Sequence, residues 1–234
     1  MNDRLFGTIC GLLRILLWRG QTLGGENLPR RGPAIFIGNH SGSLGPIACV
    51  SAAGRRMYPW IHSAMLDPHR APAYLQTDFV EKDLRLKPPA SARVAGRLAR
   101  LTVPLLHSVG CIPVYSSESL RQMQVTLQTS LEHLLAGQCL LVFPEKPEWE
   151  EDPATHIHRF SKGVLWLVEL YYLKTGLPLR IIPFSVHADH RLIWFHPPLE
   201  LTPAAFALPG GKESWIQDIE EEVREGYQGL ALSS

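Results

Sequence analysis

Two short segments of this 234-residue chain carry residue types suited to acid–base chemistry. In the first, His40 follows an apolar run at residues 34–38 (AIFIG) and precedes a turn of small residues. In the second, Glu145 follows the apolar run at residues 139–143 (CLLVF) and a rigid proline. A histidine accepts or releases a proton near neutral pH, and groups of this kind serve as general bases. Alternatively, each side chain does no more than hold its own loop together.

The apolar runs before both segments are short and continuous, which is typical of buried strands. Stretches with helical periodicity lie between the runs, so strands and helices alternate along the chain. This alternation predicts an α/β fold with a mixed sheet flanked by helices, and ligands of such folds bind where the strands end. We expect strands at residues 34–38, 58–61, 112–115, 139–143, 180–186 and 192–195, and helices at residues 44–54, 91–105, 120–136, 162–174 and 213–227.

The composition excludes several classes of protein. Apolar residues make up 45% of the chain, which suffices for a sizeable core and excludes a disordered protein. The net charge is only +1, which argues against nucleic acid as a partner. The four cysteines have neither metal-ligand nor disulfide spacing, so we expect reduced thiols. No linker is visible after the N-terminal segment, and we expect one domain over residues 21–234.

The first 20 residues differ in character from the rest. Residues 5–18 (LFGTICGLLRILLW) are apolar but too short to span a bilayer, and Arg14 interrupts them. We expect residues 1–20 to form an interfacial amphipathic helix, with Trp18 and the arginines at the level of the lipid headgroups. The protein would then be peripheral, on the cytoplasmic face of a membrane. Alternatively, this segment is an ordinary helix that packs on the core.

The helix expected at residues 91–105 adds a basic surface. Arg93, Arg97 and Arg100 lie on one of its faces, and they would strengthen attachment to anionic lipids. Alternatively, they pair with the acidic residues at 213–225. The apolar face of the same helix carries Val94, Leu98, Leu101 and Leu105.

Five segments, in order, resemble the sequence blocks of the glycerolipid acyltransferases (the PlsC-like, or lysophosphatidic acid acyltransferase, superfamily). They cover about residues 25–200, which is nearly the whole chain. The segments are NHSGSLGP at 39–46, GCIPVY at 110–115, FPE at 143–145, FSKG at 160–163 and the proline-centred IP at 182–183.

The resemblance implies a glycerolphosphate-acyltransferase-like α/β fold on a membrane surface. It implies transfer of an acyl chain from a thioester, on coenzyme A or acyl carrier protein, to a lipid hydroxyl. Neither a metal nor a resident cofactor takes part, and the family's catalytic histidine corresponds to His40, the general base. The residues that the resemblance places around the substrates are Asn39, Gly42, Ser43, Arg121, Phe143, Pro144, Glu145 and Lys146.

The chain also departs from the family pattern. Gly45 stands where the family has the aspartate that orients its histidine, and Ser116 stands where the family has an arginine. Lys146-Pro147-Glu148 replaces the glycine, threonine and arginine after FPE. With fewer arginines to bind a phosphate, we expect an acceptor that is not a glycerol phosphate. An insertion is expected around residues 60–90.

Other interpretations remain open at the sequence level. The first is a catalytically impaired relative that binds lipid or acyl chains. His62, five residues before Asp67, repeats the family spacing and is a second candidate base, although no apolar strand and asparagine precede it. A membrane scaffold without activity and a metal hydrolase are two further alternatives. The hydrolase would use His156, His158, His187 and His190, which lack an acidic residue to complete a ligand set.

Overall fold

The computed structural model describes residues 3–42, 44–82, 84–115, 119–207 and 209–232. It divides into two compact units, Tyr58–Thr129 and a larger one formed by Asn2–Met57 with Ser130–Ser234. The sequence predicted one domain from residue 21 onward. In the structure, residues 58–129 form a compact unit of their own, and the N-terminal segment belongs to the larger unit.

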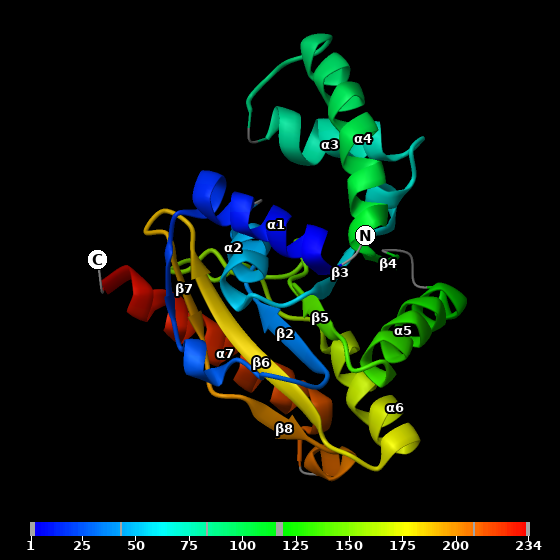
Figure 1. Cartoon of the computed structure of the whole chain (residues 1–234), viewed down its shortest axis with the longest axis vertical. Helices are drawn as coiled ribbons and strands as arrows, with labels where there is room; N and C mark the ends of the chain where they lie inside the picture. The colour runs from blue at the N-terminus through cyan, green and yellow to red at the C-terminus, as the bar shows by residue number, and fades with distance from the viewer. Residues whose placement is uncertain (1–2, 43, 83, 116–118, 208, 233–234) are drawn as a thin grey trace. The chain divides into compact units, whose positions relative to one another are not determined.

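The larger unit is built on a mixed sheet, as the alternation of apolar runs predicted (Figure 1). At its centre β2 is parallel to both β5 and β6, whereas β7 and β8 are antiparallel to β6, and β1 is parallel to β7 at the edge. The strands are β1 (Gln21–Leu23), β2 (Ala34–Gly38), β5 (Cys139–Val142), β6 (Leu179–His187), β7 (Leu192–Phe195) and β8 (Leu199–Leu201).

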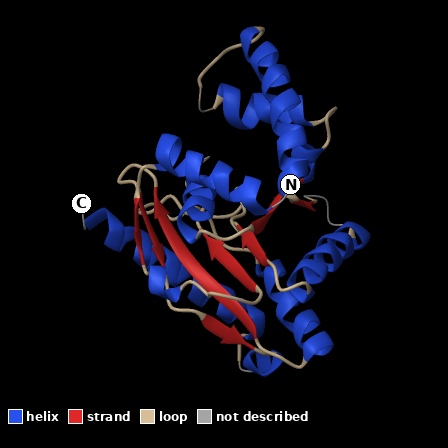
Figure 2. Cartoon of the chain, viewed as in Figure 1, coloured by secondary structure: helices blue, strands red, loops and turns tan. Residues whose placement is uncertain are grey.

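Helices cover this sheet on both faces, and strand alternation decides which side chains meet them. Phe184 and Val186 of β6 face the core that contains α2 (Leu44–Ala53). Ser185, between them, points the other way and donates a hydrogen bond to the Val223 carbonyl of α7 (Gly211–Leu232). A 3-10 turn, η5 (Lys162–Leu165), leads into α6 (Trp166–Thr175), and a second, η6 (Pro203–Ala207), precedes α7. Figure 2 shows these helices around the strands.

The N-terminal segment forms α1 (Asp3–Leu13) and a π-helical turn, η1 (Arg14–Trp18), both of which pack against α2. Trp18 is fully buried in the core, so the prediction that it lies at headgroup level is wrong. The side chains of Leu12, Ile15 and Leu16 are 52%, 65% and 62% exposed. None of the helices in the described part of the chain is long and apolar enough to cross a bilayer.

The smaller unit is mainly helical. Its strands β3 (Met57–His62) and β4 (Ile112–Val114) are parallel, and α3 (Ala71–Leu75) with the π-helical turn η4 (Gln76–Glu81) packs against α4 (Ala90–Val109). A short 3-10 turn, η3 (Ser63–Leu66), follows β3, and the boundary between the units falls within α5 (Leu120–Leu135). Helix α4 buries its small residues Ala95 and Ala99, while Leu101 and Leu105 of its predicted apolar face are exposed.

Candidate functional site

The loop after β2 presents His40 at the edge of the sheet, and the asparagine before it fixes the loop. Asn39 is buried, and its side-chain amide donates to the Val186 carbonyl at 2.9 Å and accepts from the Val186 N–H at 2.8 Å. The side chain thus continues the pairing of β2 with β6 after the β2 backbone has turned away. His40, the next residue, is exposed.

Glu145 lies beside His40 because β2 and β5 are parallel neighbours whose carboxyl ends share one edge (Figure 1). One carboxylate oxygen accepts the backbone N–H of His40 at 2.5 Å, and the other accepts the backbone N–H of His158 at 3.0 Å. The two segments that the sequence singled out therefore lie side by side in the structure. The carboxylate holds the His40 backbone, however, and both of its oxygens already have a partner.

The imidazole of His40 has its own surroundings. The ring of Phe143 packs edge-on against it, with centroids 4.9 Å apart, and Phe143 packs in turn on Phe184 of the core. Protein around the ring disfavours its charged form and lowers the pKa of His40 below its ordinary value, although a backbone hydrogen bond with Gly42 opposes this. The ring is therefore neutral at pH 7 and able to accept a proton. Among the described residues, no carboxylate forms a hydrogen bond or an ion pair with the ring.

The backbone around Gly45, where the resemblance would place an aspartate, leaves no room for a side chain. A Cβ atom at this residue would lie 1.9 Å from the His40 carbonyl oxygen and 2.7 Å from the carbonyl carbon. Both are backbone atoms, so no rotamer change relieves the contact. The close approach of α2 to the His40 loop thus requires glycine here, and an acidic side chain does not fit this backbone.

The other residues that the sequence placed around the substrates differ in their burial and their partners. Pro144 is buried, and its carbonyl accepts the Ser161 N–H at 2.8 Å. The Lys146 ammonium forms an ion pair with Glu148 at 3.6 Å. Arg121 is exposed on α5 in the smaller unit, and Ser43 and Ser116 lie outside the described residues.

The alternative candidate base, His62, has a local structural partner. Its Nδ1 accepts the backbone N–H of Ala64 at 3.3 Å, which caps the short turn η3, and its ring stacks on Tyr74 with centroids 4.6 Å apart. Asp67 accepts the N–H of His69 at 2.8 Å within the next turn. These contacts give the repeated histidine–aspartate spacing a role in local folding.

The four histidines considered as metal ligands have separate partners. His187 and His190 contact each other edge-on, and His187 also stacks on Tyr227. His156 pairs with Glu151, and His158 contacts the Trp149 carbonyl. Within the described residues, no group of three histidine, cysteine, aspartate or glutamate side chains is arranged to hold a metal ion.

A supporting network behind Glu145 was not predicted from the sequence. The N–H of Phe160 donates to the buried Glu220 carboxylate of α7 at 2.6 Å. Arg224, one turn later, contacts Glu220 at 2.9 Å and the Ile157 carbonyl at 3.2 Å. Helix α7 thereby holds the segment that contains His158, one of the two donors to Glu145. The spacing of Glu220 and Arg224 is a helical i,i+4 pair, but nothing in it indicates the distant backbone partners.

A second polar cluster joins α7 to β6 inside the core. The Ser185 hydroxyl lies 2.8 Å from Nε2 of His196, whose Nδ1 lies 3.7 Å from Glu222. The order is that of a nucleophilic triad. Ser185 and His196 are buried, however, and the hydroxyl proton is donated to Val223. The cluster therefore holds the helix, and desolvation lowers the pKa of His196 to about 4.

No protein-family model matches the chain, and no curated protein matches it either.

Proposed function

We propose that the protein is a membrane-associated acyltransferase with His40 as its general base. Support comes chiefly from one observation: an exposed imidazole, neutral at pH 7, sits at the carboxyl edge of a parallel strand pair, where α/β folds bind ligands. Glu145 is a positioning residue, since its carboxylate fixes the backbone of His40. Phe143 restricts the orientation of the ring.

In the proposed reaction, His40 removes the proton from a lipid hydroxyl while the hydroxyl oxygen attacks the carbonyl carbon of an acyl thioester. The carbon–sulfur bond then breaks, and the leaving thiolate takes the proton back from the imidazolium. An ester and a free thiol are the products. The donor is an acyl group on coenzyme A or acyl carrier protein.

The charges near the loop favour a neutral or zwitterionic acceptor. Lys146 is already paired with Glu148, and no arginine follows the strand end in this segment. A doubly charged phosphate prefers the fork of an arginine over a lone lysine. Membrane attachment through the exposed side chains Leu12, Ile15 and Leu16 would bring such a lipid to the protein.

A direct test incubates purified protein with a labelled acyl thioester and total lipids and identifies the labelled product. His40→Ala should lower turnover by about 10²–10⁴-fold, the usual worth of a general base. His69→Ala, which removes another exposed histidine, is the matched control and should leave turnover unchanged. Full activity of His40→Ala would overturn the assignment.

The pH profile adds a second readout. Because the pKa of His40 is lowered, the imidazole stays neutral down to a pH below its ordinary value of 6.5. Turnover should therefore be constant between pH 7 and 8 and fall only when the pH drops below about 6.5. An acid limb centred above pH 7 would indicate another base.

One observation favours a second candidate function, a lipid- or acyl-binding protein without turnover. The backbone contact at Gly45 leaves no room for the acidic partner that would orient the imidazole. In that case the wild-type protein should bind the acyl thioester but form no product, and His40→Ala should change binding only slightly.

A further inference from the structure

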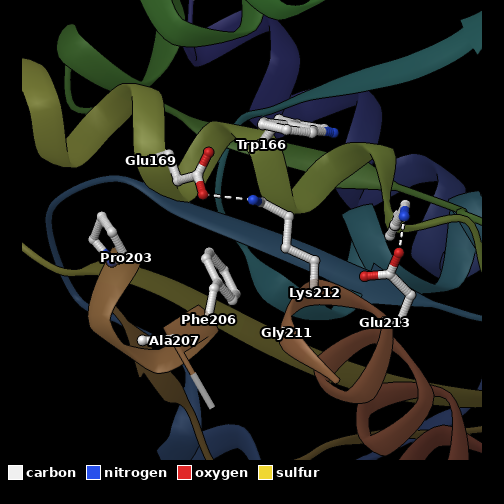
Figure 3. Close-up of a pocket in the computed structure, with 9 residues that line it drawn as sticks. Trp166, Glu169, Pro203, Phe206, Ala207, Gly211, Lys212 and Glu213 are labelled. Carbon is white, nitrogen blue, oxygen red and sulfur yellow. Dashed lines mark hydrogen bonds and ion pairs between the residues drawn. The ribbon is translucent and has the colours of Figure 1, made fainter. Parts of the chain in front are cut away.

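A cavity of about 460 Å³ lies between α6, η6 and the start of α7, and none of its lining residues belongs to the His40 loop (Figure 3). Its lining includes two lysines and two glutamates, which form two ion pairs: Lys212 with Glu169, and Lys162 with Glu213. Its volume is in the range of small-molecule sites.

A cage of two aromatic rings and a carboxylate contacts the Lys212 ammonium on the wall of this cavity. The nitrogen lies 3.9 Å from the ring centroid of Trp166, 4.9 Å from that of Phe206 and 2.5 Å from a Glu169 oxygen. Trp166 and Glu169 are three residues apart on α6, so they share one helix face. Two π faces and a carboxylate form the combination that proteins use to recognise organic ammonium ions.

The exposure of Trp166 leaves the cage partly open. Its side chain is 43% exposed although the Lys212 ammonium lies over its ring, and both residues line the cavity. The lysine itself reaches the cage from the first turn of α7. Gly210 and Gly211 precede it with φ angles of 87° and 53°, a backbone that favours glycine.

We propose that the cage of Trp166, Phe206 and Glu169 is a binding site for an alkylammonium group, which Lys212 occupies as an internal competitor. A primary ammonium is strongly hydrated, whereas a quaternary ammonium loses less hydration on entering an aromatic cage. A trimethylammonium ligand therefore competes well with Lys212. The competitor is tethered at high effective concentration, so its removal strengthens ligand binding.

The test compares wild type with Lys212→Met, which keeps the aliphatic stem but removes the ammonium. Lys174→Met, a change of the same type at a lysine outside the cavity, is the matched control. Choline is titrated by NMR, with neutral 3,3-dimethylbutanol as its uncharged isostere. Lys212→Met should bind choline more than about tenfold tighter than either other protein. The same variant should also bind choline at least about tenfold tighter than it binds the isostere.

A further change, Trp166→Leu in the Lys212→Met background, should remove choline binding. Glycerophosphocholine provides the second arm: tighter binding than choline identifies a lipid headgroup as the source of the ammonium, and weaker binding identifies a free amine. If Lys212→Met folds as wild type yet binds choline no better, or binds the isostere equally well, the cage is no ligand site. Should Lys212→Met not fold, high choline concentrations must still shift the Trp166 indole resonance of wild type, and an unmoved resonance overturns the proposal.

Discussion

Gly45→Asp, which introduces the aspartate that the resemblance to the glycerolipid acyltransferases would place here, should damage the protein rather than improve it. Carbon and oxygen atoms rarely approach closer than about 3.3 Å, so a Cβ at 1.9 Å from the His40 carbonyl forces a separation of more than about 1 Å. The carbonyl cannot move alone, because the N–H of the same residue is held by Glu145.

The cost follows from these contacts. Overpacking of this kind costs about 1–3 kcal/mol, against a gain of up to about 1 kcal/mol for replacing a helical glycine by alanine. We therefore expect Gly45→Ala to lower the free energy of unfolding by about 1–2 kcal/mol. If His40 is the base, its displacement by about 1 Å lowers turnover by up to about 10²-fold. Gly45→Asp should be at least as unstable as Gly45→Ala.

Urea unfolding followed by circular dichroism gives the stability, and labelled acyl transfer gives the turnover. Gly7→Ala in α1 is the control, because a Cβ there meets nothing within 4 Å. It should leave the protein as stable as wild type or up to about 1 kcal/mol more stable. A Gly45→Asp protein with wild-type stability and raised turnover would refute the reasoning and show that the loop yields to an orienting carboxylate.

Three further predictions concern other parts of the larger unit. The pKa of the buried His196 is about 4 against an ordinary 6.5, so the folded state binds fewer protons than the unfolded one between these pH values. The free energy of unfolding should therefore be highest above pH 6.5 and fall by about 3 kcal/mol towards pH 4, which urea unfolding at each pH measures. Gly226→Ala should lower the free energy of unfolding by about 1–3 kcal/mol, because its Cβ would lie 2.4 Å from the His196 ring. Its control is Gly229→Ala, whose nearest contact is at 3.9 Å and which should raise the free energy of unfolding slightly in the same assay. Ile15→Asn should reduce flotation with anionic vesicles, whereas the control Leu173→Asn, which changes an exposed leucine of α6, should not. Equal flotation of both variants would show that η1 does not contact the membrane.

The sequence located His40 and Glu145 correctly at one edge because each follows a continuous apolar run, and such runs become neighbouring buried strands. It did not indicate that Glu145 would contact the backbone of His40 rather than its ring. That choice depends on the path of residues 39–42 after the strand, which is set by the amide pairing of Asn39 with β6.

Hydrophobic periodicity predicted helices well and their buried faces less well. In α4 the closely packed α3 favours small residues, so Ala95 and Ala99 are buried and Leu101 is 74% exposed. A pattern of apolar residues does not separate a large exposed side chain from a small buried one. Trp18 shows the opposite error, since an aromatic next to arginines suits an interface and a core equally. The three-residue strands β1 and β8 are too short to show a period.

Two consecutive residues of the loop after β2 have different roles: the side chain of Asn39 supports the sheet, whereas the side chain of His40 is not needed for it. The side chain of residue 39 takes the place of a backbone amide, because it donates to the Val186 carbonyl and accepts from the Val186 N–H through two separate atoms. An ionised carboxylate has no donor for this pairing, and a hydroxyl offers only a single atom. Residue 40 contributes its backbone N–H to the loop, and every amino acid except proline supplies one. The imidazole can thus be exchanged for other reactive side chains while the sheet edge survives, which makes this loop a place where the same scaffold can acquire a new reaction.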